Sequence, residues 1–313
     1  MKNKPKLIFM GTPDFAVPSL KALFENNYNV LMVVTQPDRP KGRGRKIIPS
    51  PVKKAAQRIG YDVIQPVSVK NKDFLDTISG LKPDMFIVVA YGHILSKNVL
   101  GIPETGAINL HASLLPKYRG PAPIQWAIIN GEKETGVTAM LMDKGMDTGS
   151  ILLSLKEKIT KVDTSATLHD RLAVLGAGLL IKTLKSFENN DIHPIAQNHA
   201  SATYAPLLKK GDGHIVWGKN AEHIDSFIRG VTPWPGAFTF YDNKRLKIIS
   251  AKPVSVKFNE APGTVIKGFP DELRIATGKG ALSVLEIQGA SGKRLLIKDF
   301  LMGNQMPPGT VLN

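Results

Sequence analysis

The residue types best suited to chemistry are an asparagine and a histidine two positions apart, Asn109 and His111, which alternate with the apolar Ile108 and Leu110. In a β-strand, side chains two positions apart point to the same face, about 6.5 to 7 Å from each other. An amide donor and an imidazole would therefore share one face. The alternative is that both side chains only satisfy neighbouring backbone groups.

A second polar group follows an apolar stretch, where Asp143 and Asp147 are spaced among Gly145 and Gly149. A glycine-rich turn can aim a carboxylate at a histidine, which would fix the tautomer of the ring or stabilise its charged form. Both acids can instead satisfy amides of the turn itself. For Asp143 this alternative is at least as good.

Asn109, His111 and Asp147 together would supply an oxyanion donor, an acid or base, and its carboxylate partner. That set suits acyl transfer without a covalent enzyme nucleophile, and the chain contains no cysteine that could form a thioester. The remaining histidines lack the helical spacing of four that a metal pair uses, so we predict no metal site.

The elements that must hold these residues read as alternating strands and helices. Apolar runs at 6–10 and 30–34 flank an amphipathic stretch at 15–25, which is typical of a β-α-β unit. Ser50 is placed to cap a helix that runs through Ile59.

Further strands are predicted at 85–90, 108–110 and 137–142, followed by a long helix at 164–187. The expected fold is therefore α/β, with a doubly wound, mostly parallel sheet that is Rossmann-like. Such sheets bind ligands at the carboxyl ends of their strands, where Asn109 and His111 would lie.

The pattern changes after His193 to short alternating segments separated by turns. A hairpin is predicted over 237–250 with its turn at Asp242 and Asn243. Further strands are expected near Thr264, Leu273, Ala281 and Lys298. We predict a small C-terminal β-barrel that is OB-like, because closure removes exposed strand edges. The expected domains are 1–197 and 211–313, joined by a linker at 198–210.

Charge is the unusual feature of the composition. The 313 residues include 41 Lys and Arg against 26 Asp and Glu, a net charge of +15. Residues from 210 onward carry 14 of these basic residues and 9 of the acidic ones, so both parts are basic. A hydrophobic fraction of 42% excludes wholesale disorder. Apolar runs are too short to span a membrane, so we expect a soluble, cytoplasmic protein with a polyanionic partner.

A basic loop over 36–48 follows the second predicted strand, and loops of this length and Gly/Pro content usually bind a partner or stay mobile. Its cations are suited to phosphate contacts, and an RNA backbone is the partner that they indicate. These candidate residues are Arg39, Lys41, Arg43, Arg45 and Lys46. A solvated loop without a partner is the alternative.

With these motifs assembled, the chain resembles the methionyl-tRNA formyltransferase family over essentially its whole length. The matching segments are 11–15, 36–40, 109–120, 142–149 and 229–237. The segment 109–120 alone indicates the wider group of enzymes that use 10-formyltetrahydrofolate, and the basic loop with the second domain narrows the resemblance. Val216 departs from the family pattern, in which an acid stands at that position.

The resemblance implies transfer of a formyl group from 10-formyltetrahydrofolate to the α-amine of methionine on initiator tRNA, by a monomer. It implies Asn109, His111 and Asp147 as catalytic residues, with the pterin near 88–91. The folate-binding residues would be Ser113, Leu114, Leu115 and Pro116. The basic loop, Arg43 above all, and the barrel would bind the tRNA.

Two alternatives remain at this point. A formyltransferase or a formate-releasing hydrolase that acts on a small molecule with the same folate would keep Asn109, His111 and Asp147 but would not need the basic loop. A non-catalytic RNA-binding protein would explain the charge equally well, but not three intact polar residues.

Overall fold

The computed structural model describes residues 4–41, 46–268, 270–289 and 292–313, and the chain forms two compact units. The first unit comprises residues 1–123, 134–158 and 169–205, and the second comprises 124–133, 159–168 and 206–313. The expected boundaries divide the chain once along its length, whereas this grouping is discontinuous. Two short segments within the expected first domain, 124–133 and 159–168, belong to the second unit.

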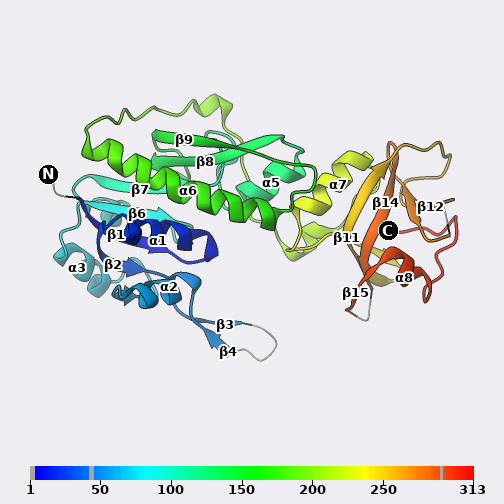
Figure 1. The fold of residues 1–313 in the computed structure, drawn as a ribbon, viewed down its shortest axis with the longest axis horizontal. Helices are drawn as coiled ribbons and strands as arrows, with labels where there is room; N and C mark the ends of the chain where they lie inside the picture. Colours follow the sequence, from blue (N-terminus) through cyan, green and yellow to red (C-terminus); the bar gives the residue numbers. More distant parts are fainter. Residues whose placement is uncertain (1–3, 42–45, 269, 290–291) are drawn as a thin grey trace. The chain divides into compact units, whose positions relative to one another are not determined.

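A seven-stranded sheet forms the centre of the first unit (Figure 1). Its order is β5 (Val63–Ile64), β2 (Asn29–Val34), β1 (Lys6–Gly11), β6 (Met85–Val89), β7 (Gly106–His111), β8 (Glu134–Leu141) and β9 (Ile151–Lys158). The strands from β5 to β7 are parallel, whereas β8 and β9 are antiparallel to their neighbours. The predicted doubly wound, mostly parallel sheet is confirmed.

Strand β9 lies outside the strands expected from the sequence. It pairs with β8 at the end of the sheet, and its residues alternate between more and less exposed positions. Alternation with a period of two is typical of a strand with one solvated face. The signal was therefore present in the sequence, although weaker than the continuous apolar runs of β1 and β6.

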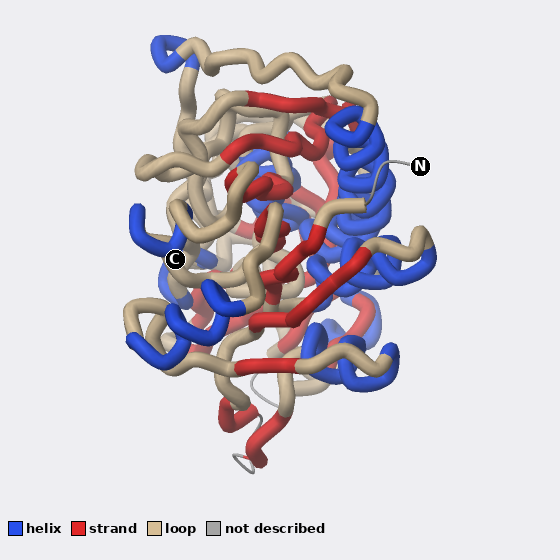
Figure 2. The backbone as a smooth tube through the Cα atoms, turned by 90° about the vertical axis from the view of Figure 1, so that its left-hand side faces the viewer, coloured by secondary structure: helices blue, strands red, loops and turns tan. Residues whose placement is uncertain are grey.

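The helices of the two units are α1 (Val17–Glu25), α2 (Pro51–Ile59), α3 (Lys72–Gly80), α4 (Lys97–Leu100), α5 (Pro123–Ile129), α6 (Ser165–Glu188), α7 (Ala221–Gly230) and α8 (Ile297–Leu301). The predicted helical segments at 15–25, 50–59 and 164–187 are present, whereas α3, α4, α7 and α8 were not predicted; Figure 2 shows the helices in blue and the strands in red. Ser50 caps α2 as predicted, since its Oγ accepts a hydrogen bond from the backbone N–H of Lys53 at 3.0 Å. Among the described residues, no helix is long and apolar enough to cross a membrane.

A six-stranded antiparallel sheet forms the centre of the second unit, which confirms the expected β-domain. Its strands are β10 (Phe238–Tyr241), β11 (Lys244–Val254), β14 (Ala281–Gln288), β13 (Leu273–Ala276) and β12 (Val265–Ile266) in this order, with β15 (Arg294–Leu296) paired to β14. No pairing among the described strands joins β10 to β12, so the sheet is a half-barrel.

The predicted hairpin of this unit is present. Asp242 and Asn243 connect β10 to β11 with φ of 53° and 60°, the positive values that a tight two-residue hairpin turn requires. The strand expected near Lys298 is present as β15, which ends two residues before it, and Lys298 itself lies in α8. Ile297 and Phe300 are both buried, and this spacing of three is a helical period.

The basic loop contains a short hairpin, β3 (Arg39–Lys41) paired with β4 (Lys46–Ile48). Arg39 is exposed. Arg43 and Arg45 lie outside the described residues. A carboxylate sits at the base of this hairpin, where Asp38 accepts hydrogen bonds from Lys53 Nζ and Gln65 Nε2, each at 2.7 Å.

Candidate active site

Asn109 and His111 stand at the carboxyl end of β7, in the middle of the sheet. Asn109 pairs with Val88 of β6 and Met140 of β8, and His111 pairs with Thr138 of β8. His111 is buried, whereas Asn109 is half-buried. The strand geometry places both side chains on the face opposite to the buried Ile108 and Leu110, as expected.

Asp147 is brought to His111 by the turn that follows β8. Its Oδ2 lies 3.6 Å from His111 Nδ1 and accepts a hydrogen bond from the backbone N–H of Gly120 at 2.8 Å. Asp147 has a φ of 55°, in the left-handed region that residues with a Cβ rarely adopt. The turn is therefore built to direct this carboxylate.

The second ring nitrogen of His111 defines the tautomer. Nε2 lies 2.8 Å from the carbonyl oxygen of Tyr118. Because a carbonyl can only accept, Nε2 carries the hydrogen and donates it. Nδ1 then faces the Asp147 carboxylate, whose Oδ2 lies 3.6 Å away. The arrangement places the imidazole and the carboxylate side by side, with Nδ1 as the ring atom that faces the acid.

Asp143 satisfies donors of its own turn, which is the alternative considered for it. Its Oδ1 accepts hydrogen bonds from the backbone N–H of Gly145 at 2.9 Å and from Thr148 Oγ1 at 2.6 Å. The carboxylate thus closes the turn that carries Asp147. Neither of these two hydrogen bonds reaches Asn109 or His111.

The segment 113–116 lies directly after β7. Ser113 is fully buried, and its hydroxyl donates to the Lys117 carbonyl at 2.6 Å, which folds the loop on itself. The backbone N–H of Leu115 donates to Thr138 Oγ1 at 3.2 Å, which ties the loop to β8. Leu114 and Pro116 are half-buried.

The segment 88–93, beside which the pterin is expected, has two buried polar atoms without partners among the described residues. Tyr91 Oη and His93 Nε2 are buried, and neither has a hydrogen-bond partner among the described residues. Burial raises the pKa of Tyr91 to about 12. The Tyr91 carbonyl accepts from Thr12 Oγ1 at 2.9 Å and from Gln36 Nε2 at 3.1 Å. These contacts join the carboxyl ends of β1, β2 and β6.

Two residues of the site were not predicted as such. Arg119 is 2% exposed and its guanidinium donates to Gln197 Oε1, and Gln197 in turn donates to the carbonyls of Asp147 and Gly149. Arg119 belongs to the motif 109–120, which was its only signal. Gln197 lies in an irregular segment 50 residues from Asp147 and has no local pattern that could have identified it.

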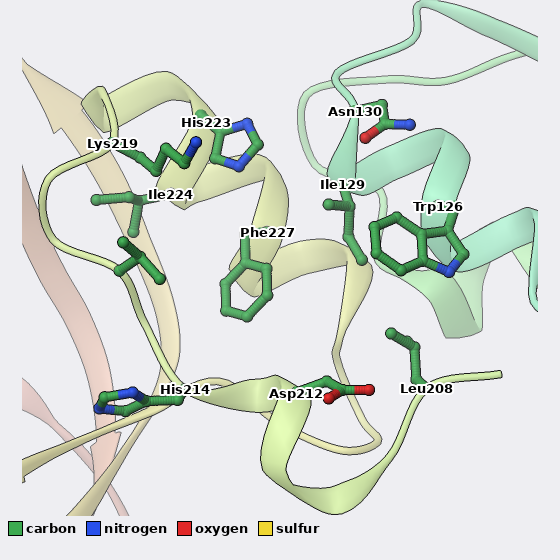
Figure 3. Close-up of a pocket in the computed structure, with 11 residues that line it drawn as sticks. Trp126, Ile129, Asn130, Leu208, Asp212, His214, Lys219, His223, Ile224 and Phe227 are labelled. Carbon is green, nitrogen blue, oxygen red and sulfur yellow. The ribbon is translucent and has the colours of Figure 1, made fainter. Parts of the chain in front are cut away.

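Each unit also contains a cavity. One of about 310 Å³ lies behind the Asp147 turn and is lined by 141–143, 148–150, 196–197 and 199. The other, of about 220 Å³, lies in the second unit between α5, α7 and the segment 208–219 (Figure 3). Trp126, Ile224 and Phe227 give it an apolar lining. Of these two cavities, the first is lined by Thr148, the chain neighbour of Asp147, and by Gln197.

Comparison with known proteins finds similarity along nearly the whole chain. Residues 5–184 match the model of the formyl transferase family, and residues 207–305 match that of the formyl transferase C-terminal domain. Among solved structures, a sugar 3N-formyl transferase determined with dTDP and 5-N-formyl-THF superposes with a TM-score of 0.69 at 21% identity, covering 92% of this chain and 98% of its own. The N-formyltransferase from Helicobacter canadensis, determined with folinic acid and dTDP-3-aminofucose, gives 0.68 at 22% identity, covering 90% and 98%. These two similarities show the fold.

Two sequence relatives share a much higher sequence identity with this chain than these solved structures do. The methionyl-tRNA formyltransferase of Caldanaerobacter subterraneus subsp. tengcongensis is 53% identical over 308 residues, which cover 98% of this chain and 99% of the relative. That of Clostridioides difficile is 44% identical over 307 residues, with coverage of 98% and 99%. With such identity along nearly its whole length, the chain belongs to the methionyl-tRNA formyltransferase family of formyl transferases.

Proposed function

We propose that this chain transfers the formyl group of 10-formyltetrahydrofolate to the α-amine of methionine esterified to initiator tRNA. The observation that carries the proposal is the approach of Asp147 Oδ2 to within 3.6 Å of His111 Nδ1, at the strand end that also holds Asn109. The sequence relatives are methionyl-tRNA formyltransferases, which supports the tRNA substrate. The folates in the solved relatives support 10-formyltetrahydrofolate as the formyl donor.

In this reaction the neutral amine attacks the formyl carbon, and negative charge develops on the formyl oxygen. Asn109 would donate its amide N–H to that oxygen, and His111 would add positive charge or a proton beside it. The carbon–N10 bond then breaks, N10 takes up one proton, and the new amide nitrogen loses one. Asp147 would hold the His111 ring in its orientation and accept the released proton, directly or through water.

The folate would lie along the loop after β7 and the crevice at 88–91. The unpartnered Tyr91 Oη and His93 Nε2 are polar atoms that a heteroaromatic pterin with donors and acceptors can satisfy. Leu114, Leu115 and Pro116 offer apolar and backbone contacts. The Ser113 hydroxyl is already bonded to Lys117, so we assign this side chain to shaping the loop.

The tRNA would be bound by the basic loop, through Arg39, Lys41, Arg43, Arg45 and Lys46, and by the β-domain at 211–313. The catalytic chemistry is assigned to residues 1–197. The positive charge of both parts supports this division, because phosphate contacts supply much of the affinity for nucleic acid. We infer a cytoplasmic monomer, and light scattering on the purified chain tests the oligomeric state.

The decisive experiment is a transfer assay with 10-formyltetrahydrofolate and methionyl initiator tRNA, in parallel with uncharged tRNA, free methionine and no acceptor. Transfer to the charged tRNA alone is the expected result, and it should weaken as salt rises. Formate release without an acceptor would show a hydrolase instead. Binding of tRNA without any reaction would show a non-catalytic RNA-binding protein.

The basic loop is tested in the same assay. Replacement of Arg43 and Arg45 by Ala should raise the KM for tRNA and lower the dependence of binding on salt by about one unit of slope for each phosphate that the loop no longer neutralises. Turnover at saturating tRNA should change little. An unchanged salt slope would contradict the proposed binding of the phosphate backbone.

A further inference from the structure

We propose that Gln197 is a positioning residue for Asp147, and that Arg119 fixes the orientation of the Gln197 amide. The proposal rests on the role given to Asp147 in the proposed function. Gln197 is buried, and its Nε2 donates to two carbonyl oxygens of the same turn, that of Asp147 at 2.9 Å and that of Gly149 at 2.7 Å. One amide group therefore holds the main chain on both sides of Thr148.

Arg119 determines which end of the amide faces the turn. Its Nε and NH2 groups both donate to Gln197 Oε1, at 3.1 Å and 2.7 Å, and NH2 also lies 3.1 Å from His199 Nδ1. A guanidinium can only donate, so the oxygen of the amide must point to Arg119. The amide nitrogen of Gln197 then faces the two carbonyl oxygens. In the reversed orientation, the N–H groups of the amide would face the N–H groups of Arg119.

The turn needs such support because of its conformation. Asp147 has a left-handed φ of 55°, which costs free energy for a residue with a Cβ. Gly149 comes so close to the Leu141 carbonyl that a Cβ at this position would collide with it. The surrounding contacts must therefore hold the backbone of Asp147 in place, and the Gln197 amide supplies two of them.

The short segment 118–120 also holds the side chains of His111 and Asp147. The Tyr118 carbonyl accepts from His111 Nε2, the Arg119 side chain orients Gln197, and the Gly120 N–H donates to Asp147 Oδ2. Three consecutive residues thus fix the histidine, the main chain of the acid and its carboxylate. Without Gln197 the carboxylate would keep its Gly120 donor, whereas the main chain that carries it would be released at two carbonyls.

Removal of these hydrogen bonds should affect turnover rather than binding. The hydrogen bonds of the Gln197 side chain run to Arg119, Asp147 and Gly149, and none of these runs to Asn109 or the loop 113–116. A misplacement of a catalytic group by about 1 Å can cost about 100-fold in rate. We therefore expect kcat to fall roughly 10- to 100-fold, with the KM values for folate and tRNA within about 3-fold of the parent.

Two variants test this. Gln197→Met keeps the length of the side chain and removes every hydrogen bond. Gln197→Glu keeps an acceptor for Arg119 but sets an oxygen against the carbonyls of Asp147 and Gly149. Both should lower kcat within that range. Each change is also made in an Asp147→Asn background. There Gln197→Met should lower kcat no more than about 2-fold, because the carboxylate that Gln197 positions is already absent.

Thr183→Val is the control for a purely structural effect. Thr183 is buried in α6, and its hydroxyl donates to the Leu179 carbonyl at 2.8 Å, a hydrogen bond that involves none of the site residues. It should lower the melting temperature without changing kcat. Parent-like turnover of Gln197→Met, or an equal penalty in both backgrounds, would overturn the proposal. If Asp147→Asn alone is fully active, the role proposed for Asp147 fails first, so the two failures can be told apart.

Discussion

The backbone N–H of Gly120 donates at 2.8 Å to Oδ2 of Asp147, the same oxygen that lies 3.6 Å from His111 Nδ1. Gly120 has a φ of 114°, and a Cβ at this position would lie 2.9 Å from the Ala205 carbonyl oxygen. A larger residue would have to move the loop. One backbone donor in a loop that requires glycine therefore helps set the separation between the acid and the ring.

Gly120→Ala should consequently lower both stability and turnover. We expect a loss of about 1 to 3 kcal/mol in the free energy of unfolding, because alanine is strained at this φ. The displaced N–H should lower kcat as well. Urea unfolding and transfer assays measure the two effects. Gly178→Ala is the matched control, since a Cβ there meets nothing within 4 Å in α6, and it should be neutral or stabilising.

Asn109→Ala removes the proposed oxyanion donor. Turnover should fall about 100- to 1000-fold, whereas the KM values should hardly change. Single-turnover kinetics separate the chemical step from binding. Ile108→Val changes the opposite face of β7 and should cost about 1 kcal/mol of stability with normal turnover. Equal losses of activity in both variants would point to damage to the strand rather than to loss of a catalytic amide.

His111→Gln tests proton handling. The glutamine amide can still donate to the Tyr118 carbonyl, but it cannot exchange a proton with Asp147. Turnover should fall between about 100-fold and 10,000-fold, with folate binding retained. Fluorescence titration with a folate analogue checks the second expectation. A variant with near-parental kcat would mean that His111 only supports the loop.

Ser50→Ala tests the cap of α2. It removes the hydrogen bond from Lys53 N and the one between Ser50 Oγ and Thr35 Oγ1 at 2.8 Å. The free energy of unfolding should decrease by about 1 kcal/mol. Ser50→Asp should retain most of it, because aspartate caps equally well. If Ser50→Ala is as stable as the parent, the cap contributes nothing measurable.

His223 should make the stability of the second unit depend on pH. It lines the cavity of Figure 3, where burial, and then the charge of Lys219, lowers its pKa below the usual value of 6.5. The unfolded chain then binds the proton more readily than the folded one. Stability should be full above about pH 6.5 and should fall as the pH drops toward the folded pKa.

Unfolding of the parent and of His223→Asn at about pH 7.5 and pH 5.5 measures this contribution. The variant lacks the histidine component, so it should lose less stability than the parent on acidification. Lys219→Met should reduce the same component only in part, because burial is the larger cause. An identical pH dependence in parent and His223→Asn would contradict the expectation.

Much of the site framework could be predicted because its signals are local. The spacing of Asn109 and His111 on one strand, and the Ser50 cap, depend only on near neighbours in the sequence, and both are present in the structure. The parallel sheet followed from long apolar runs. The direction of β8 and the existence of β9 did not, because pairing across a sheet depends on residues far apart in the chain.

The supports of Asp147 show where sequence reasoning stops. Gln197 reaches the turn from 50 residues away, and no periodicity marks it. The segment 203–205 likewise pairs with Arg119 through backbone hydrogen bonds, which carry almost no sequence signature. The boundary between β15 and α8, at Leu296 and Ile297, could not be predicted either, since a short apolar segment reads equally well as a strand or a helix until its packing is known.

The discontinuity of the second unit has a consequence for the newly made chain. Ile129 packs in one core with Trp217, Ile224 and Ile228, although about ninety residues separate it from them along the sequence. Trp126 packs against the same core. During synthesis, the apolar side chains of 124–129 leave the ribosome long before the residues that will cover them. The last third of the chain thus completes a surface begun in the first half, and a message truncated near codon 206 would yield a chain with that surface uncovered.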